Sequence, residues 1–559
     1  MNFIIRLLFP LLLGATFSVL AAAPVTPTDA GRVLQDNQAP GSPNTPLPPP
    51  IQAPQTPKQA VPAGAAQDVR VNVSEFAFSG NSVISTEALQ AAVAEFTNRE
   101  LNFGELLQVT DKIETLYHQA GYFLAQATLP PQQIRDGVIS IAVTEGKLGK
   151  VRLEGESRVK PEVLYHYLDR LPTGEVIIES QLDRQALLAS ELAGAEIKLD
   201  LQAGDDPGTT DVVLVQQATP LFTGRIGLDN YGLPATGENR LSVSAALNSP
   251  FHLGDRLSAN FIVSDDRNLH TYGLRYELPI GGDGWRVSLA KTRAVYSLGG
   301  AFSALNASGT ADSWRAGVSY PWLRSRSANI NLQLEADLNN LEDNLGAAGL
   351  DLKKRSYGFT FSPSADWSDK LWGGGNNQFA AEMRAGRVNL GAVARTLDVA
   401  PAGPDTDGVF GKLTFNLSRR QAITNTIALS GHWKQQFATT NLESSEKISV
   451  GGAQTLMAYP SSQATGDEGG IGKLELRWQA RDNLSLGAFV EYAHLKLLHN
   501  PIAGSTTNHA NFRDVGFALN WAVHPKVDFA ASVAWAGGQP PNPADNDRPR
   551  IWGNLGYHW

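Results

Sequence analysis

The chain has 559 residues, with 55 Asp and Glu against 46 Lys and Arg and no Cys. Its length allows several domains with sizeable cores, its net charge of −9 argues against a general nucleic-acid-binding protein, and the lack of Cys excludes disulfide frameworks, thiolate zinc sites and cysteine nucleophiles. The mean hydropathy of −0.19 is that of a soluble protein, yet all 11 Trp lie at or after Trp285, which indicates two parts in different surroundings.

The N-terminus has the pattern of an export signal. An early Arg6 is followed by an apolar stretch and then by small residues that end at Ala23. This pattern predicts a secretory signal peptide over residues 1–22, and the Pro and Gly within the apolar stretch disfavour the alternative of an anchor helix. Beyond it there is no run of 18 apolar residues, so a helical membrane protein is excluded. A soluble exported protein or a β-barrel remains.

Residues 23–69 form a Pro-rich linker interrupted by one short helical pattern. Residues 24–66 contain 11 Pro. The exception is the stretch at about 28–38, TDAGRVLQDNQ, which predicts about three helical turns with Val33 and Leu34 on one side. A helix this short is not stable alone in water, so it must dock on the protein or be disordered.

Residues 70–217 read as two copies of one small mixed unit, at 70–147 and 148–217. In each copy the hydrophobic periodicity predicts the order β-α-α-β-β, and Ser85 is the expected N-cap of the first helix. A unit of this size with no catalytic motif is typical of a binding module.

From about residue 218 the pattern becomes a series of alternating strands. In Lys473–Trp478, for example, apolar side chains alternate with Lys, Glu and Arg, as in a sheet exposed to water or in the wall of a membrane barrel. Sixteen such strands fit into residues 218–559, about 21 residues for each strand and connection, which suits a transmembrane barrel. The last strand places Tyr557 and Trp559 on its apolar face and ends the chain on an aromatic residue. We therefore predict a transmembrane β-barrel of 16 antiparallel strands.

Local sequence resembles a known family at several points in the same order. The segments are FAFSGN (Phe76–Asn81), GYFLAQATLPPQQIRDG (Gly121–Gly137), TEG (Thr144–Gly146), LDNYG (Leu228–Gly232), NSPFHLGDRL (Asn248–Leu257) and YELPIGGDGW (Tyr276–Trp285). The first three resemble a polypeptide-transport-associated (POTRA) domain, and the others resemble the first barrel strands of two-partner secretion transporters. These are the haemolysin-activator and filamentous-haemagglutinin transporters, within the superfamily that includes the barrel-assembly insertase.

The resemblance implies an outer-membrane transporter of a Gram-negative bacterium. POTRA 1 (70–147) and POTRA 2 (148–217) would capture the secretion domain of a large exoprotein of adhesin, haemolysin or toxin type in the periplasm, and the barrel would pass it to the cell surface. The short helix would plug the lumen at rest. Capture by strand addition would use an edge at Tyr122–Thr128 or Thr210–Gln216.

The resemblance also implies the other partners and the chemistry. We expect contact with outer-membrane lipid, a monomeric state, and recognition of Tyr557 and Trp559 by periplasmic chaperones and the barrel-assembly machinery during biogenesis. We expect no enzymatic activity, no catalytic residues, no nucleic acid and no cofactor. The sequence has no phosphate-binding loop, and its ten His have no metal-ligand spacing, so we expect no metal site.

A loop between strands eleven and twelve of this family folds back into the barrel, and here it corresponds to residues 446–470. The family pattern is matched by Gly451, Gly452, Thr455, Tyr459, Gly466 and Asp467. At the tip, Met457 stands in place of the family's Arg and Ala458 in place of its Gly, and Glu491 replaces the Asp that pairs with that Arg.

Two interpretations of this departure remain open. Either the loop still inserts, held by apolar packing of Met457 and Tyr459 and by backbone contacts, or transport is reduced or lost. In the first case Glu491 needs another cation, and alternation offers the lumen-facing residues Arg225, Arg275 and Arg477.

Two other functions compete with protein secretion. A barrel insertase or assembly factor of the same superfamily usually carries more POTRA copies and the Arg-Gly tip. A passive porin or an outer-membrane enzyme would need neither the POTRA pair nor the plug helix.

Overall fold

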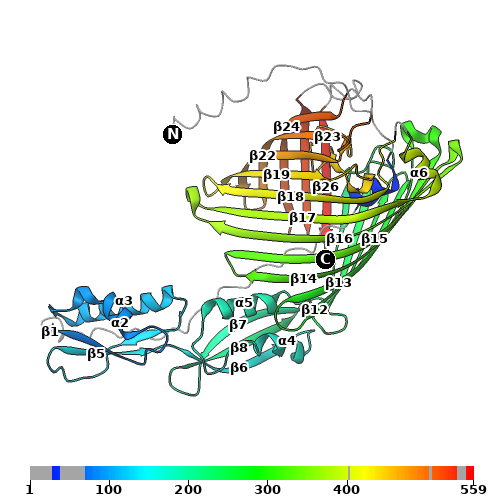
Figure 1. The fold of residues 1–559 in the computed structure, drawn as a ribbon. Helices are drawn as coiled ribbons and strands as arrows, with labels where there is room; N and C mark the ends of the chain where they lie inside the picture. Colours follow the sequence, from blue (N-terminus) through cyan, green and yellow to red (C-terminus); the bar gives the residue numbers. More distant parts are fainter. Residues whose placement is uncertain (1–27, 38–69, 401–402, 503–506, 538–548) are drawn as a thin grey trace, which may run out of the picture.

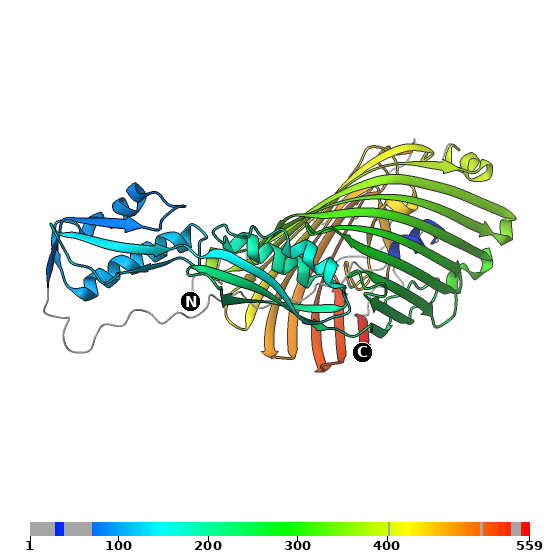
Figure 2. The same ribbon diagram turned by 90° about the horizontal axis from the view of Figure 1, so that it is seen from below.

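The computed structural model describes residues 28–37, 70–400, 403–502, 507–537 and 549–559. Two α/β units extend as an arm from one end of a large β-barrel (Figures 1 and 2). Among the described residues, no helix is both long enough and apolar enough to cross a membrane. The predicted signal peptide and the Pro-rich linker lie outside the described residues.

The first α/β unit, residues 70–147, contains one strand that was not predicted. Its elements are β1 (Val71–Val73), β2 (Glu75–Ser79), α2 (Thr86–Ala92), β3 (Arg99–Leu101), α3 (Phe103–Gln119), β4 (Gln126–Thr128) and β5 (Val138–Thr144). Ser85 caps α2 as predicted, because its side chain accepts the N–H of Ala88 at 3.3 Å. The three-residue β3 pairs with β1 and gives no periodic signal. Strand β4 begins later than predicted because Tyr122 and Ala125 close a turn after α3.

The core of this unit is apolar, with one buried carboxylate at its edge. Phe76, Leu89, Ile113, Tyr117 and Ile141 are among its buried side chains. Glu145 is 5% exposed and accepts the N–H of Ser82 at 2.6 Å, the N–H of Val83 at 3.0 Å and the hydroxyl of Tyr117 at 2.9 Å. Burial raises the pKa of Glu145, but these hydrogen bonds outweigh it and hold the pKa below its ordinary value.

The second α/β unit, residues 148–217, corrects one prediction about sheet edges. Its elements are β6 (Lys147–Glu156), α4 (Pro161–Leu168), α5 (Glu179–Ser190), β7 (Ala195–Ala203) and β8 (Thr209–Ala218). The strand order is β6-β8-β7, so the predicted edge Thr210–Gln216 is wrong: β8 pairs on both sides. In the first unit the order is β2-β5-β4, and β4 does lie at an edge, where Glu114 accepts the N–H of Ala127 at 3.0 Å.

The two units are joined through a shared core. Leu124, in the turn before β4, packs into the second unit beside Leu148, Ile177 and Leu182. The N–H of Ile177 donates to the carbonyl of Gly146 at 3.1 Å, which adds a backbone contact across the junction. Burial of Leu124 therefore stabilises the junction between the two units.

The barrel has sixteen antiparallel strands in a closed ring, as predicted. Its strands are β9 (Phe222–Asp229), β10 (Arg240–Asn248), β11 (Arg256–Ser264), β12 (Leu269–Ile280), β13 (Trp285–Ser297), β14 (Ala307–Arg324), β15 (Ala328–Leu345), β16 (Leu350–Asp369), β17 (Gly375–Leu390), β18 (Gly408–Ala422), β19 (Ile427–Ala438), β22 (Glu468–Arg481), β23 (Leu484–Lys496), β24 (His509–His524), β25 (Val527–Ala536) and β26 (Arg550–His558). A helix, α6 (Ala392–Asp398), follows β17.

The seam where the last strand meets the first is short. Strand β26 pairs with β9 only from Asn554 to His558, opposite Asp229 to Arg225, whereas β14 and β15 pair over nearly their whole length. Beyond the paired part, the side chain of Asn230 donates to the carbonyl of Ile551 at 2.9 Å and accepts the N–H of Gly553 at 2.8 Å. The seam is thus held partly by side chains.

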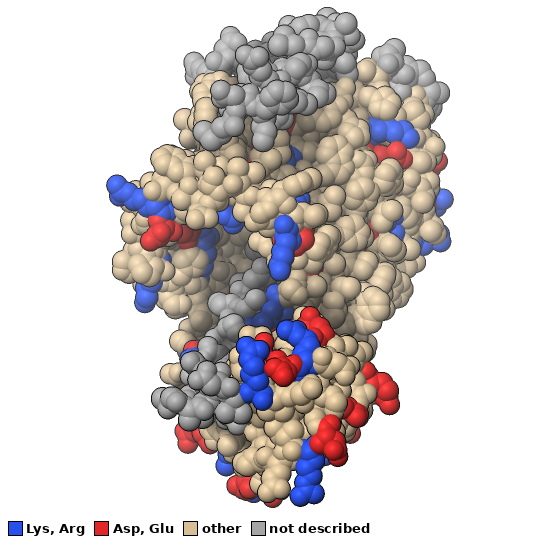
Figure 3. All heavy atoms as spheres, turned by 90° about the vertical axis from the view of Figure 1, so that its left-hand side faces the viewer, with Lys and Arg blue, Asp and Glu red and all other residues tan. Residues whose placement is uncertain are grey.

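The two faces of the barrel wall have opposite chemistry. On the outside, Leu474, Leu476 and Trp478 are each 44–51% exposed. On the inside, the alternate residues of the same strand form ion pairs, such as Arg477 with Glu475 at 2.6 Å. Figure 3 accordingly shows broad uncharged areas on the barrel and more frequent charged residues on the α/β units below it.

The second α/β unit is held against one rim of the barrel by ion pairs. We call this rim, which carries the turns before β13 and β15, the near rim. Glu191, after α5, pairs with Arg324 at 2.6 Å and with Arg286 at 3.0 Å. Asp183 on α5 pairs with Arg326 at 2.9 Å. The near rim therefore faces the arm, and the opposite end is the far rim.

Candidate functional site: the lumen helix and the in-folded loop

A short helix occupies the inside of the barrel. Helix α1 (Ala30–Asp36) is enclosed by the barrel strands (blue in Figures 1 and 2). Asp29 caps it by accepting the N–H of Arg32 at 3.0 Å. Val33 and Leu34 are 0% and 2% exposed and pack against wall residues of β12, β13 and β15, namely Leu269, Ala294, Tyr296 and Leu341. The predicted side of the helix is therefore the one that docks.

A buried lysine holds the start of α1. Lys354 of β16 lies 2.8 Å from Asp29, 3.0 Å from Glu443 and 3.5 Å from Asp343, and all three distances join its ammonium to a carboxylate oxygen. Asp343 of β15 also accepts the N–H of Ala30 at 2.7 Å. One cation is thus shared by the helix, the barrel wall and the loop after β19, and removing it would leave three carboxylates facing each other.

The other side of α1 rests on the in-folded loop. Arg32 donates to Asp36 at 3.1 Å and to Ser462 at 3.0 Å, and it also contacts Ser449. The side-chain amide of Gln35 donates to the carbonyl of Lys447 at 2.7 Å. The helix and the loop therefore form one polar assembly.

The in-folded loop, residues 446–470, returns into the lumen as a narrow hairpin. Its two stems are β20 (Ile448–Val450) and β21 (Ala464–Gly466), which pair with each other and not with the barrel. Gly451 and Gly452 both have φ of +103°, and a Cβ on Gly451 would collide with the carbonyl of Pro460. The glycines that match the family pattern are thus required by the backbone of this hairpin.

The tip of the loop is held by its main chain. The N–H of Met457 donates to Glu491 of β23 at 2.9 Å, and the N–H of Ala458 donates to Asp514 of β24 at 2.8 Å. Leu456 is fully buried, and Tyr459 is 3% exposed and packs edge-on against Phe512 at 5.2 Å between ring centres. Two adjacent N–H groups therefore bind two carboxylates of the barrel wall, and the side chain of Met457 makes none of these hydrogen bonds.

The cation that pairs with Glu491 differs from the predicted candidates. Lys473 of β22 lies 3.3 Å from Glu491. The three arginines proposed from alternation have other partners: Arg225 pairs with Asp528, Arg275 with Glu277, and Arg477 with Glu475. Lys473 lies directly opposite Glu491 in the register of β22 and β23, so the two side chains are neighbours on the lumen face and can pair.

The last strand also holds the tip. The indole N–H of Trp552 on β26 donates to the carbonyl of Met457 at 2.7 Å, and Trp552 is 3% exposed. On the other side of the seam, the hydroxyl of Ser461 donates to the carbonyl of Tyr231, just after β9, at 3.0 Å. The tip thus contacts both sides of the short seam.

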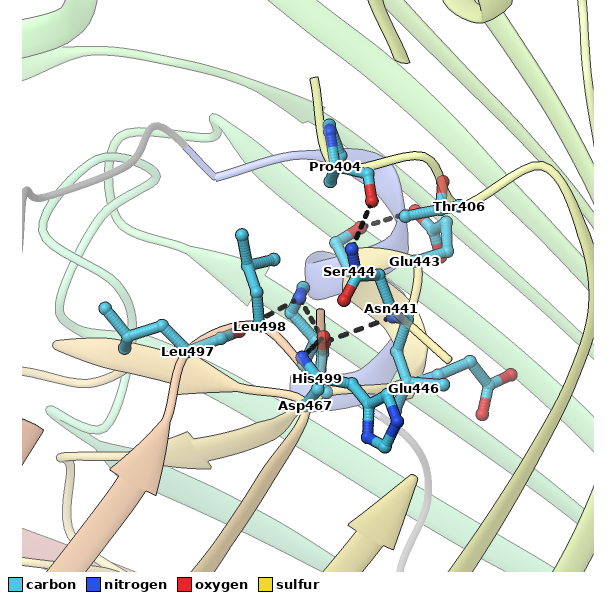
Figure 4. Close-up of polar contacts among 12 residues, drawn as sticks. Pro404, Thr406, Asn441, Glu443, Ser444, Glu446, Asp467, Leu497, Leu498 and His499 are labelled. Carbon is cyan, nitrogen blue, oxygen red and sulfur yellow. Dashed lines mark hydrogen bonds and ion pairs between the residues drawn. The ribbon is translucent and has the colours of Figure 1, made fainter. Parts of the chain in front are cut away.

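Asp467 ties the stem of the loop to the far rim, and Asn441 joins two further loops of that rim (Figure 4). Asp467 is 0% exposed, accepts the N–H of Leu442 at 3.1 Å and of His499 at 2.8 Å, and pairs with Lys447. Asn441 donates to the carbonyl of Pro404 at 2.5 Å and accepts the N–H of Asn500 at 2.7 Å. Three loops of the far rim, after β17, β19 and β23, are therefore joined above the lumen.

The other predicted site residues lie close to these contacts. Thr455 donates from its hydroxyl to the carbonyl of Gly451 at 3.1 Å and so closes the hairpin. Gly466 lies beside the carbonyl of Lys496, where a Cβ would come within 2.7 Å. Tyr557 faces outward on β26, and the main chain of Trp559 bonds to the main chain of Gly224 on β9. Within the described residues, no three His, Asp or Glu side chains are grouped to hold a metal ion.

Comparison with known families identifies the relatives of this architecture. Residues 208–496 match the family described as haemolysin secretion/activation protein ShlB/FhaC/HecB, which is more than half of the chain. The chain belongs to this family. Residues 71–146 match the ShlB-type POTRA domain, so the first α/β unit of the transporter is a POTRA domain.

Individual relatives are similar along most of their length. The heme/hemopexin transporter protein HuxB of Haemophilus influenzae (strain 86-028NP) is 24% identical over 484 residues, which is 84% of either chain. The outer membrane transporter CdiB of Dickeya dadantii is 23% identical over 77% of either chain. The transporter therefore sits in the outer membrane with its POTRA domains in the periplasm, which makes the near rim periplasmic and the far rim extracellular.

Solved structures share the fold. CdiB from Escherichia coli matches with a TM-score of 0.69 at 19% identity, over 90% of this chain and 93% of that one. BamA from Haemophilus ducreyi matches with a TM-score of 0.51 at 14% identity, over 87% of this chain and all of that one. The fold is thus the one that we predicted for this chain from its resemblance to the two-partner secretion transporters.

Sequence reasoning did not find four of the residues that hold the transporter's lumen contents. They are Lys354, Asp514, Trp552 and Asn441. Alternation along β16 and β24 places Lys354 and Asp514 on the lumen face, but nothing in the sequence says which of many lumen charges meets α1 or the tip. Trp552 could have been found from the sequence. Alternation places it on the lumen face of the last strand, whereas Tyr557 on the same strand faces outward.

Proposed function

We propose that α1 and the in-folded loop together close the lumen of this two-partner secretion transporter at rest, and that α1 leaves when the partner exoprotein is engaged. The exoprotein then passes through the barrel, which belongs to a protein-secretion family. The observation that carries the proposal is the polar attachment of α1: its N-cap Asp29 is bound by Lys354, and the helix itself is bound to the in-folded loop through Arg32 and Gln35.

This attachment suits a reversible plug. Ion pairs and hydrogen bonds can be exchanged for water when the helix moves into an aqueous channel, so their net contribution to holding the helix is modest. Ala30, Val33 and Leu34 add a small apolar contact. A helix packed by a wide apolar face would be held too tightly to leave. Residues 38–69 provide the length of chain that ties α1 to the first α/β unit.

The alternative of a passive porin is disfavoured by the filled lumen, because a porin of this size has an open channel. An assembly factor of the same superfamily remains the second candidate, supported by the shared fold with BamA. Deleting the transporter separates these two functions. Loss of one surface exoprotein with normal amounts of other barrel proteins supports secretion, whereas a general loss of barrel proteins supports assembly.

Capture of the exoprotein is assigned to the α/β units in the periplasm. We propose that its secretion domain adds to the edge of β4, where a peptide strand would compete with Glu114 for the N–H of Ala127. We also propose that Tyr557 and Trp559 act as the signal that the barrel-assembly machinery reads during insertion, since Tyr557 lies at the periplasmic end of the last strand and Trp559 follows that strand directly.

A reversible cross-link tests the plug. A Cβ on Gly31 would lie 2.5 Å from the hydroxyl oxygen of Ser444, so the pair Gly31→Cys and Ser444→Cys is close enough for a disulfide. The chain has no Cys of its own to interfere. We expect the cross-linked transporter to insert normally but to secrete no exoprotein, and a reductant to restore secretion. Either single Cys variant is the control. Full cross-linking with unchanged secretion would contradict the plug.

A further inference from the structure

The outer wall of the barrel carries a trough that runs from the near-rim half of β18 to the far-rim half of β24. It crosses β18, β19, β22, β23 and β24, and its volume is about 710 Å³. The register places two rows of outward residues along it. The upper row is Leu417, Trp433, Gly472, Tyr492 and Arg513, and the lower row is Arg419, Gly431, Leu474, Val490 and Val515. We call this feature the outer trough.

The outer trough has apolar walls and a bare floor. Leu474, Val490 and Val515 are 44%, 45% and 50% exposed, on the side that faces lipid. At Gly431 a Cβ would have no neighbour closer than 3.9 Å, so the backbone there is uncovered. At Gly472 the ring of Trp433 lies over the backbone and forms part of the wall. Five strands at the usual spacing of about 4.8 Å give a trough roughly 19 Å long, which suits a hydrocarbon chain.

The upper edge of the outer trough is polar. The next outward row toward the extracellular rim contains Gln435, His494 and Asn511. The ring of His494 stacks near Trp433 at 6.2 Å, and the hydroxyl of Tyr492 donates to Asn511 at 3.3 Å. Aromatic residues followed by polar ones mark the level at which lipid head groups begin.

The two arginines of the outer trough differ in their partners. Arg419, at the periplasmic end, pairs with Asp369 at 2.6 Å. Arg513, at the extracellular end, is exposed and donates to the carbonyl of Gly537, and it has no ion pair with any carboxylate of the described residues. A guanidinium on a lipid-facing wall is costly unless an anion meets it, and a phosphate oxygen matches its geometry.

We propose that the outer trough binds one lipid A molecule, the phosphorylated glycolipid of the outer leaflet, with an acyl chain over Gly431 and a phosphate against Arg513. The apolar walls explain the place of the chain, and Arg513, to which the described residues offer no carboxylate, explains the choice of a phosphorylated lipid. The proposal concerns the outer face of the barrel and is independent of how the lumen opens.

Bound lipid can be counted by native mass spectrometry of the full-length transporter purified from outer membranes in mild detergent. We expect one retained molecule of diphosphorylated lipid A per chain. Gly431→Leu, which fills the floor, and Arg513→Gln, which removes the charge, should each lower the retained fraction at least about tenfold, equivalent to about 1.4 kcal/mol. Val515→Trp narrows the trough from the opposite wall and should act like Gly431→Leu.

Two matched variants and one analogue serve as controls. Gly553→Leu adds the same side chain at another outward glycine with open space around it, and Arg355→Gln removes an exposed arginine of β16 far from the trough. Both should retain lipid A as the wild type does, and a phosphate-free lipid A analogue should bind the wild type no better than it binds Arg513→Gln. Heat-modifiable migration in gels shows that each variant is folded.

Two results would overturn the proposal. Equal retention in the wild type and in folded Gly431→Leu and Val515→Trp would mean annular lipid only. Equal retention of the phosphorylated lipid and its phosphate-free analogue by the wild type would remove the role of Arg513.

Discussion

The cores of the α/β units and the lumen of the barrel are both buried, but they are built from different groups. The first unit buries Phe76, Leu89 and Ile113 with one carboxylate, Glu145, at the edge. The lumen has apolar contacts too, around α1 and the loop tip, but it also buries many charged and polar side chains, among them Asp343, Glu443, Glu446, Asp467, Glu491 and Asp514. The α/β units are therefore closed by the hydrophobic effect, whereas the lumen adds specific pairs to it.

This difference separates permanent structure from removable structure. Apolar packing is lost only when surface returns to water, so the α/β units stay folded as a rigid arm. Ion pairs in a channel can be replaced one by one by water or by a passing chain. The lumen contents can therefore be held at rest and released without unfolding the barrel.

The largest expected effect is the removal of the shared cation in the lumen. Lys354→Met keeps the length of the side chain but leaves Asp29, Asp343 and Glu443 without their cation. Breaking a buried pair by removing one partner costs about 3–5 kcal/mol, so we expect α1 to leave the lumen and single-channel conductance to rise. Lys353→Met, at the adjacent exposed position, should leave conductance unchanged. A closed channel in Lys354→Met would show that the polar cluster does not hold the helix.

A comparable loss of stability should follow from a cavity in the apolar core of the α/β units, but the channel should stay closed. Leu124→Ala removes the side chain that joins the two α/β units. A Leu→Ala change in a core costs about 2–5 kcal/mol, so we expect faster proteolysis between the units and less secretion at normal conductance. Ile134→Ala, at a 40% exposed position, is the control. Increased conductance in Leu124→Ala would contradict this difference between the core of the α/β units and the lumen of the barrel.

A smaller effect is expected from one hydrogen bond at the loop tip. Trp552→Phe keeps an aromatic ring but leaves the carbonyl of Met457 without its donor. An unsatisfied buried acceptor costs about 1–3 kcal/mol, so the temperature at which the barrel unfolds in gel-shift assays should fall. Trp535→Phe, at an outward position of the neighbouring strand, should have no effect. The same unfolding temperature for both variants would exclude a role of this bond.

The smallest effect is expected at the position where the family has Arg. Met457 contributes its N–H to Glu491, and its side chain takes no part in that bond. Met457→Ala should therefore keep secretion within about twofold of the wild type, as for a substitution that breaks no specific contact. Met457→Arg introduces a cation that competes with Lys473 for Glu491, and secretion should change more. Unchanged secretion in both variants would exclude a role of this side chain.

Much of the architecture could be predicted from the sequence because it depends on local periodicity. The sixteen strands follow from alternation, and the Ser85 cap follows from a short-range pattern. Where a segment is short or irregular the prediction failed: β3 has three residues, and the central position of β8 depends on which strands pair, so Thr210–Gln216 was wrongly placed at an edge.

In the candidate site, too, local patterns in the sequence predicted the segments but not most of their contacts. The sequence by itself determined that a glycine-bearing loop with a substituted tip would need a new partner for Glu491, because a charge opposite an altered residue is visible from the family pattern. Only the tertiary structure decided that the partner is Lys473, that Asp514 and Trp552 bind the tip, and that Lys354 holds α1. The reason is physical: periodicity fixes which side of the wall a residue faces, whereas a pair in the lumen depends on the register of neighbouring strands, as for Lys473 and Glu491, or on segments as distant as Asp29 and Lys354 meeting in the folded barrel.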